Sequence, residues 1–184
     1  MTTGSSESDL PVCKSDTVEI TQRPYDHPDA VRLVRALYDE QVARYGFADP
    51  VDADPAEYAP PHGLFLIIYS ANVPSACGGY RPYDPGTSTV EVKKMYTIPD
   101  LRGEGLGRLV LFALQQHAGR HGAAGAILET GAHSHAALSL FRQAGYQPTG
   151  RYARGRDAAI NRAFFKDLSD LQSSVRDDLR AIAQ

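Results

Sequence analysis

The chain has 184 residues and a net charge of −3, with 42% hydrophobic and 22% charged residues, which is typical of one globular domain that buries a core. The slightly acidic balance offers no broad basic surface for nucleic acid or an anionic membrane, and no apolar run approaches the roughly 18 residues of a membrane span. The N-terminus has no apolar signal segment, and the two cysteines, Cys13 and Cys77, predict free thiols in a cytoplasmic protein.

The first third of the chain predicts a tail, a strand, a helix and a loop. Residues 1–16 are polar and predict a disordered tail. Residues 17–23 alternate between polar and apolar side chains and predict a strand. Pro28 suits the first turn of a helix, whose apolar residues recur at helical spacing until Gly46 ends it. The acidic, proline-rich residues 49–62 predict a loop, with at most one short helical turn, that could cover a substrate.

Three strands are predicted next, over residues 64–69, 75–83 and 89–98. Short turns join them, so we expect each to run antiparallel to its neighbour. The continuous apolar run over 64–69 indicates a strand that is buried on both faces.

The rest of the chain alternates between helices and strands. The connection from the strand at 89–98 to the next strand should be parallel and right-handed. The sequence therefore predicts a mixed α+β domain over residues 17–166, followed by an amphipathic C-terminal helix over 167–184. The later elements are a helix from Leu106, a strand over 126–130, a helix over 135–144, a hairpin over 146–153 and 159–166, and the last helix.

A glycine-rich turn separates the predicted strand at 89–98 from the helix that begins at Leu106. Gly103, Gly105 and Gly107 let the backbone turn tightly and approach a ligand without an intervening Cβ. A helix that starts there points unpaired N–H groups into the turn, which predicts an anion site, most often for phosphate. No Gly-Lys-Ser/Thr follows, so this is not a Walker loop, and its spacing and mid-chain position do not fit a Rossmann turn.

The spacing Arg102-x-x-Gly105-x-Gly107, after a strand and before a helix, resembles the acetyl-CoA loop of the GNAT superfamily of N-acetyltransferases. Further blocks agree with that family in order and spacing, over residues 17–166 in all. Residues 77–81 and 91–96 resemble its third and fourth strands, and residues 128–131 and 137–146 resemble its fifth strand and fourth helix.

This resemblance implies the GNAT fold: a central mixed sheet of six to seven strands with helices on both faces, whose fourth and fifth strands splay apart to admit pantetheine. It also implies acetyl-CoA as a co-substrate and no metal. Ser134 stands where the family has an asparagine, and Phe141 stands where a tyrosine often protonates the departing thiolate. That acid is therefore missing, or it is supplied by water, Tyr80, Tyr146 or Tyr152. The positions matched to cofactor contacts are Met95, Tyr96, Thr97, Arg102, Gly103, Glu104, Gly105, Leu106, Gly107, Arg108, Ser134 and Phe141.

Acetyl transfer to an amine needs a base, because a primary amine with a pKa of about 10 is mostly protonated at neutral pH. Glu91 is the first candidate, since it lies in the fourth strand and the period of two places it on the same face as Met95. Glu129 in the fifth strand is the second, and a solvent-facing glutamate is the plainer alternative for each. His133 and His135 have no carboxylate or cysteine nearby, so we expect surface positions, or a substrate-lining or base role for one of them, and no metal site.

The sequence thus predicts a cytoplasmic, acetyl-CoA-dependent N-acetyltransferase that acts on a primary amine of a small molecule. Direct attack in a ternary complex is expected, since Cys77 lies in no nucleophile motif. The alternatives are a non-catalytic CoA-binding sensor or interaction module, another acyl donor, and an oxygen or peptide-amine acceptor. No nucleic-acid or membrane partner is expected, and the chain is predicted to be a monomer, or a homodimer formed through its last helix.

Overall fold

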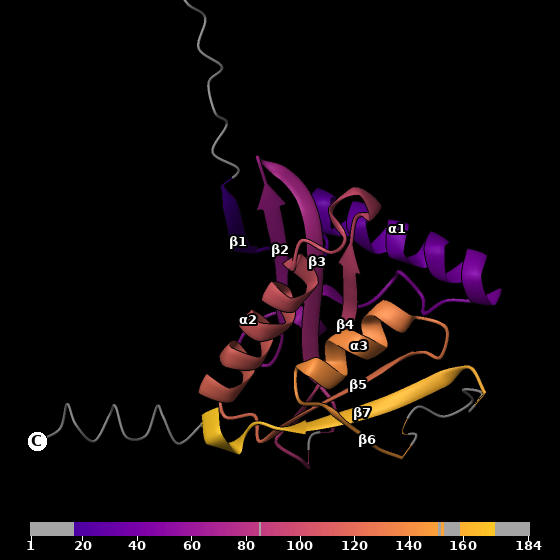
Figure 1. The fold of residues 1–184 in the computed structure, drawn as a ribbon. Helices are drawn as coiled ribbons and strands as arrows, with labels where there is room; N and C mark the ends of the chain where they lie inside the picture. Colours follow the sequence, from indigo (N-terminus) through magenta and orange to yellow (C-terminus); the bar gives the residue numbers. More distant parts are fainter. Residues whose placement is uncertain (1–16, 85, 151, 153–158, 172–184) are drawn as a thin grey trace, which may run out of the picture.

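The computed structural model describes residues 17–84, 86–150, 152 and 159–171. These residues form a seven-stranded sheet in the order β1-β2-β3-β4-β5-β7-β6 (Figure 1). The predicted tail over 1–16 and most of the predicted C-terminal helix lie outside the described residues. The strands are β1 Val18–Gln22, β2 Leu64–Ser70, β3 Val73–Pro82, β4 Thr89–Thr97, β5 Gly125–Gly131, β6 Gln147–Pro148 and β7 Asn161–Asp167.

The sheet is mixed in direction. Neighbouring strands from β1 to β4 run antiparallel, as the short turns between them predict. β4 and β5 run parallel, because the chain between them crosses over through a helix. β7 then pairs antiparallel with both β5 and β6. The predicted α+β architecture is therefore confirmed.

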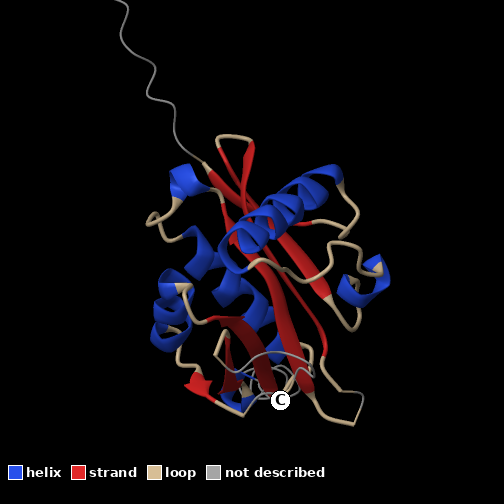
Figure 2. Ribbon diagram, turned by 90° about the vertical axis from the view of Figure 1, so that its right-hand side faces the viewer, coloured by secondary structure: helices blue, strands red, loops and turns tan. Residues whose placement is uncertain are grey.

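Helices cover both faces of this sheet (Figures 1 and 2). α1 Pro28–Tyr45 and the short helix η1 Pro55–Tyr58 pack on one face, and α2 Leu106–Arg120 and α3 His135–Gln143 pack on the other. A single turn, η2 Pro99–Leu101, leads from β4 towards α2. Within the described ranges, no helix combines the length and the apolar character that a bilayer span requires.

Two apolar cores flank the sheet, and β2 contributes to both. Leu64, Leu66 and Ile68 face the core beneath α2 and α3. Phe65 and Ile67 face the core beneath α1. Because successive side chains of a strand point to opposite faces, a strand between two cores is apolar at every position. This explains the continuous apolar run in the sequence.

β4 contains a β-bulge at Lys94, where φ is +59° and the register against β3 shifts. Val92 faces the core beneath α2, and Met95 packs against the same core although it follows Val92 by three positions, an odd step. Glu91 points to the opposite face, towards Arg81. The predicted common face of Glu91 and Met95 is therefore wrong, because the extra residue of a bulge resets the two-residue period.

Candidate active site

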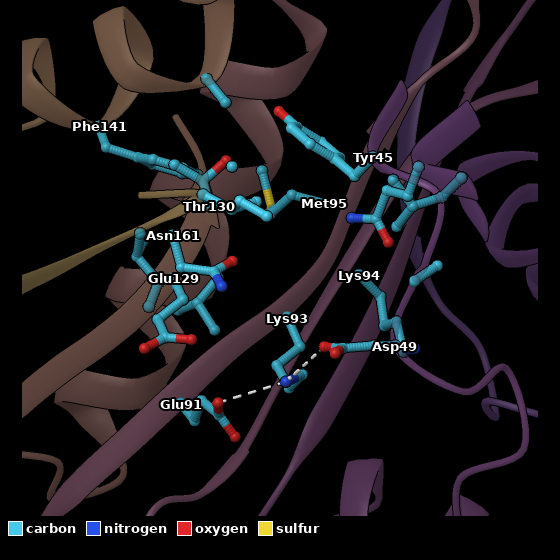
Figure 3. Close-up of a pocket in the computed structure, with 18 of the residues that line it drawn as sticks. Tyr45, Asp49, Glu91, Lys93, Lys94, Met95, Glu129, Thr130, Phe141 and Asn161 are labelled. Carbon is cyan, nitrogen blue, oxygen red and sulfur yellow. Dashed lines mark hydrogen bonds and ion pairs between the residues drawn. The ribbon is translucent and has the colours of Figure 1, made fainter. Parts of the chain in front are cut away.

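β4 and β5 separate after a short stretch of pairing and leave an opening in the sheet (Figure 3). Their pairing ends where Glu91 meets Ile127, whereas β4 continues to Thr97 and β5 to Gly131. In the described part of the chain, no strand fills the space between them. The opening holds about 860 Å³ of empty space, and this volume includes open solvent at its mouth. The splayed strands implied by the resemblance are present.

The glycine-rich turn at the start of α2 is built from backbone. Gly103 and Gly105 have φ of +90° and +81°, in the left-handed region that favours glycine. The described residues provide no side-chain cap for α2, so its first N–H groups face the turn. A Cβ placed on either glycine would meet no atom within 4 Å, which leaves room for a ligand. The turn therefore fits an anion such as a pyrophosphate.

Arg102 ties this turn to its surroundings. Its Nε–H donates to the Thr97 carbonyl at 3.0 Å, and its guanidinium pairs with Glu40 of α1. The same guanidinium lies 5.6 Å from the centre of the Tyr96 ring. Arg102 thus joins the end of β4 to α1, and a contact with a cofactor would compete with these bonds. The exposed side chains beside it are Glu104 and Arg108.

The other matched positions of the turn and of β4 use their side chains for packing. Leu106 is 6% exposed, and Met95 packs against the core beneath α2. Gly107 lies next to Thr97, and a Cβ there would be 3.5 Å from Thr97 Oγ1, an ordinary contact. Backbone groups are therefore the main feature that this end of the opening offers to a ligand.

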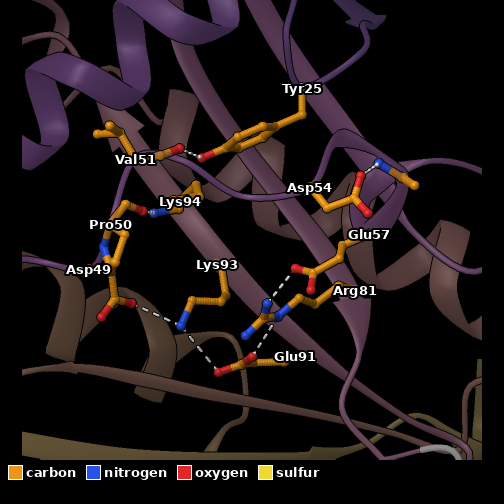
Figure 4. A network of polar contacts seen from close by, with 11 residues as sticks. Tyr25, Asp49, Pro50, Val51, Asp54, Glu57, Arg81, Glu91, Lys93 and Lys94 are labelled. Atoms are coloured by element: carbon orange, nitrogen blue, oxygen red, sulfur yellow. Dashed lines mark hydrogen bonds and ion pairs between the residues drawn. The ribbon is translucent and has the colours of Figure 1, made fainter.

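The other end of the opening is built from charged side chains around Glu91, which is only 7% exposed (Figure 4). Arg81 Nε donates to Glu91 Oε2 at 3.0 Å. Lys93 Nζ at 3.3 Å and the Tyr152 hydroxyl at 3.0 Å donate to Oε1. Two cations thus compensate the buried charge. A carboxylate offers about four lone pairs, so these three bonds leave one free on Oε2.

The same cations hold the loop between α1 and β2 against the sheet. Lys93 Nζ pairs with Asp49 at 2.8 Å, and Arg81 pairs with Glu57 of η1. The predicted loop over 49–62 thus contains one short helix and lies beside Glu91. Two further side chains bind its backbone: Lys94 Nζ donates to Pro50 O at 2.7 Å, and the Tyr25 hydroxyl donates to Val51 O at 2.7 Å.

Glu129 faces the opening from β5 (Figure 3). Glu91 is in register with Ile127, and Glu129 follows Ile127 by two residues, so it lies on the same face. Asn161 of β7 also lines the opening next to Glu129. The structure thus brings both predicted base candidates to one opening, from neighbouring strands.

Of the three tyrosines predicted as possible acids, Tyr152 is the one that bonds to Glu91. The Tyr80 hydroxyl instead bonds to His117 Nδ1 at 2.7 Å beneath α2, and burial raises the pKa of Tyr80 to about 12. Tyr146 is 1% exposed, and burial raises the pKa of its hydroxyl above the usual value. Tyr80 and Tyr146 therefore belong to the core and not to the opening.

The residues matched to the family's asparagine and tyrosine contact other parts of the protein. Ser134 Oγ hydrogen-bonds with the Tyr45 hydroxyl at 2.8 Å and accepts from Arg44 at 3.2 Å, so it joins the start of α3 to α1. Phe141 is 4% exposed but also lines the opening. His133 stacks on Tyr45, with ring centres 6.1 Å apart. Among the described residues, no three His, Cys, Asp or Glu side chains form a group that could hold a metal ion.

Cys77 is fully buried beneath the bulge of β4. Its S–H donates to the Lys94 carbonyl at 3.3 Å. Burial raises the pKa of this thiol to about 12, although the nearby charge of Lys94 and a backbone hydrogen bond oppose the shift. Because the thiolate is the reactive form, Cys77 lacks the properties of a nucleophile.

Sequence reasoning missed Arg81, Lys93 and Asp49, which surround Glu91. A signal for two of them was present. Lys93 follows Glu91 by two positions in one strand, and the predicted hairpin places Arg81 opposite Glu91, where the register has it. Asp49 had no such signal, because it lies in an irregular loop whose position depends on tertiary contacts.

Known proteins resemble this chain in sequence and fold. Residues 34–146 match the family model described as the acetyltransferase (GNAT) family. The chain is 26% identical over 140 residues to the uncharacterized N-acetyltransferase C1271.07c of Schizosaccharomyces pombe, a match that covers 74% of this chain and 85% of that protein. A crystal structure from Klebsiella pneumoniae, assigned to the acyl-CoA N-acyltransferases, is 27% identical with a TM-score of 0.69, over 82% of this chain and 97% of that one. A Bacillus subtilis acetyltransferase in complex with CoA shares the fold, at 14% identity and a TM-score of 0.59, over 82% of this chain and 99% of that one.

Proposed function

Because the chain belongs to the GNAT family of acetyltransferases, we propose that it transfers an acetyl group from acetyl-CoA to a primary amine of a small molecule. One observation supports this proposal most directly. The gap between β4 and β5 has a backbone anion site near one end, where Gly107 meets Thr97, and the buried carboxylate of Glu91 at the other.

Acetyl-CoA combines a pyrophosphate, an arm with two amides, and a thioester that supplies the acetyl group. The N–H groups at the start of α2 suit the pyrophosphate. The edge of β4 beyond Glu91 suits the amides, because they can pair with a free strand edge as a peptide does. The Bacillus subtilis acetyltransferase with a similar fold was crystallised with CoA. Residues 95–97 and 102–108 are accordingly the proposed cofactor contacts.

Glu91 is the proposed general base. An amine with a pKa of about 10 must lose a proton before it can attack. The lone pair that Glu91 Oε2 retains can take this proton, directly or through a water. Arg81 and Lys93 fix the carboxylate in position, so little reorganisation is needed. Glu129, in the same opening, is the second candidate.

Tyr152 is the proposed acid in place of the tyrosine that Phe141 replaces. Its hydroxyl donates to Glu91. A proton that Glu91 gains can therefore pass to Tyr152 while Tyr152 gives its own proton to the departing group. The buried thiol of Cys77 supports direct attack of the amine over a covalent acetyl-enzyme.

The acceptor is proposed to be a small cation before it loses its proton. Asp49, Glu91 and Glu129 line the opening together with Lys93 and Lys94, and a carboxylate there can pair with an ammonium group of the acceptor. The loop over 49–57 is bound to the sheet beside Glu91, which narrows the approach and favours a small molecule over a folded protein.

The test is release of CoA thiol from acetyl-CoA in the presence of a panel of small primary amines, with the acetylated product identified by mass. We expect release with at least one cationic amine, and release slower by roughly 10²-fold or more at neutral pH when Glu91 is replaced by glutamine. Calorimetric titration of CoA into the same protein separates the alternatives. CoA binding without thiol release from any amine would favour a non-catalytic CoA-binding module.

A further inference from the structure

The outer face of α2 carries two large apolar side chains. Phe112 is 57% exposed and Leu109 is 37% exposed. They are three residues apart, so they are neighbours on the helix surface. The other large apolar side chains of α2 are buried against the sheet, namely Leu106, Val110, Leu111 and Leu114.

One end of this outer face is already covered. Leu171 lies directly over Gly119, where a Cβ would be 2.6 Å from the Leu171 Cβ. Any residue larger than glycine at position 119 would therefore collide with Leu171. Phe112 precedes Gly119 by seven residues, about two helical turns, so both lie on the same side of α2. The contact with Leu171 thus begins a stripe that continues through Phe112 to Leu109.

The chain arrives at this contact as the start of a helix. The N–H of Leu168 donates to Ala124 O at 2.8 Å, which holds the end of β7 near the end of α2. The carboxylate of Asp167 then accepts from the backbone N–H of Ser169 at 2.8 Å and from its hydroxyl at 2.6 Å. An aspartate in this position caps a helix, and the chain is helical from Ser169 to Leu171.

The remaining sequence continues the apolar pattern of Leu171. Val175, Leu179 and Ile182 follow it at intervals of four, four and three residues, the spacing of one helix face. A helix from Leu171 to Ile182 would extend about 16 Å, and α2 extends about 15 Å from Gly119 back to Leu109. The two apolar rows therefore match in length.

We propose that residues 172–184 continue this helix antiparallel to α2 and cover Phe112 and Leu109. Val175 then lies between Gly119 and Phe112, and Leu179 lies over Phe112. The covered stripe runs to within one turn of the glycine-rich turn. The C-terminal segment is thus an internal brace for the helix that begins at the anion site.

A second copy of the chain is the alternative partner for the same stripe. The contact between Leu171 and Gly119 favours the segment of the same chain, because it already places Leu171 on α2. Residues 172–184 follow Leu171 directly, so no linker separates them from the stripe. Such tethering gives a high effective concentration.

Cross-linking distinguishes the two partners. In a Cys13→Ser background, Phe112→Cys is combined with Leu179→Cys and treated with a short bis-maleimide. We expect a cross-link within one chain, found by peptide mapping of the monomer band. The matched control pairs Leu179→Cys with Val31→Cys, which is 53% exposed on α1, and should give no such product. A 112–179 product found only in covalent dimers, or no 112–179 product, would overturn the proposal.

Stability provides a second readout that needs no cysteine. Phe112→Ser should lower the Tm of the full chain by roughly 2–8 °C. In the chain truncated after Leu171 the same change should leave the Tm unchanged or raise it, because Phe112 is then already exposed. Val31→Ser serves as the control and should have an equally small effect in both chains. An equal loss of Tm from Phe112→Ser in the two chains would contradict the proposed contact.

Discussion

The two ends of the opening between β4 and β5 offer different chemical groups to a ligand. At the α2 end the functional groups are backbone N–H groups exposed by glycine. At the Glu91 end they are charged side chains from β3, β4 and the loop after α1 (Figure 4). A backbone site depends on the absence of side chains, whereas a side-chain site depends on pairing every buried charge. Adding a side chain should therefore impair the α2 end, whereas removing a charged side chain should impair the Glu91 end.

The largest expected effect is at Gly107. Gly107→Asp should abolish measurable CoA binding, because it puts bulk and negative charge against the N–H groups of the turn. Gly107→Ala should weaken binding roughly tenfold or more, if the added methyl group keeps one phosphate oxygen from its N–H donor. A hydrogen bond to a charged group contributes about 1.5–3 kcal/mol. The fold should tolerate the added Cβ, whose nearest neighbours would be 3.5 and 3.6 Å away.

Calorimetric titration of CoA into each variant measures this effect, and circular dichroism verifies folding. Glu104→Gln is the control within the same turn, because it changes an exposed side chain and leaves the backbone intact. We expect it to change affinity by less than about fivefold, the range of one exposed charge. Unchanged affinity in folded Gly107→Asp would refute the backbone site.

The next effect is on catalysis. Glu91→Gln should lower kcat at neutral pH by roughly 10²-fold or more, as for the loss of a general base. The loss should shrink at high pH, where the amine loses its proton without help. Glu57→Gln is the matched control, because Glu57 also pairs with Arg81 but does not line the opening. It should retain most of the wild-type kcat.

Thiol-release assays across pH measure both variants. CoA affinity should be unchanged in each, since the anion site lies at the other end of the gap. A Glu91→Gln variant with wild-type kcat at every pH would remove Glu91 from the mechanism and leave Glu129 as the candidate.

A smaller effect distinguishes the ion pairs of the two ends. Arg81→Met should lower the unfolding free energy by about 1–3 kcal/mol, because Glu91 loses a hydrogen bond in a buried position. The Glu91 side chain is 9% exposed. Arg102→Met should lower it by less than about 1 kcal/mol, since exposed pairs contribute little. The Arg102 side chain is 42% exposed.

Urea denaturation of both variants gives the two values. Equal losses of unfolding free energy in the two variants would contradict the expectation that the buried ion pair contributes more than the exposed one. Each variant removes one guanidinium, and Arg81 pairs with Glu57 as well as with Glu91, whereas Arg102 pairs with Glu40.

The smallest expected effect concerns Cys77, which lies beneath the bulge between the two ends. With a pKa of about 12, the thiol has almost no thiolate near neutral pH, and its reactivity should rise only at strongly alkaline pH or on unfolding. In a Cys13→Ser background the folded protein should therefore release no colour from Ellman's reagent, and the denatured protein should release one equivalent. Cys77→Ala should keep the wild-type kcat, and a large loss would instead favour a covalent route.

Local sequence features predicted much of the fold. The apolar run over 64–69, the helical spacing up to Gly46 and the short turns predicted buried and antiparallel elements that the structure confirms. Each of these features involves residues that are close in the sequence, which is the range over which hydrophobic periodicity and turn chemistry act. The bulge at Lys94 could not be predicted in this way, because alternation assumes an unbroken period of two.

By itself the sequence determined the glycine-rich turn, the family resemblance and the position of Glu91 on the strand before that turn. Those features are local, since glycine permits positive φ and a helix exposes its first N–H groups wherever it begins. Only the tertiary structure decided which face Glu91 occupies and which charges surround it. Asp49 and Tyr152 are distant from Glu91 in the chain, and only tertiary packing brings them to the carboxylate that β3 and β4 already pair with Arg81 and Lys93.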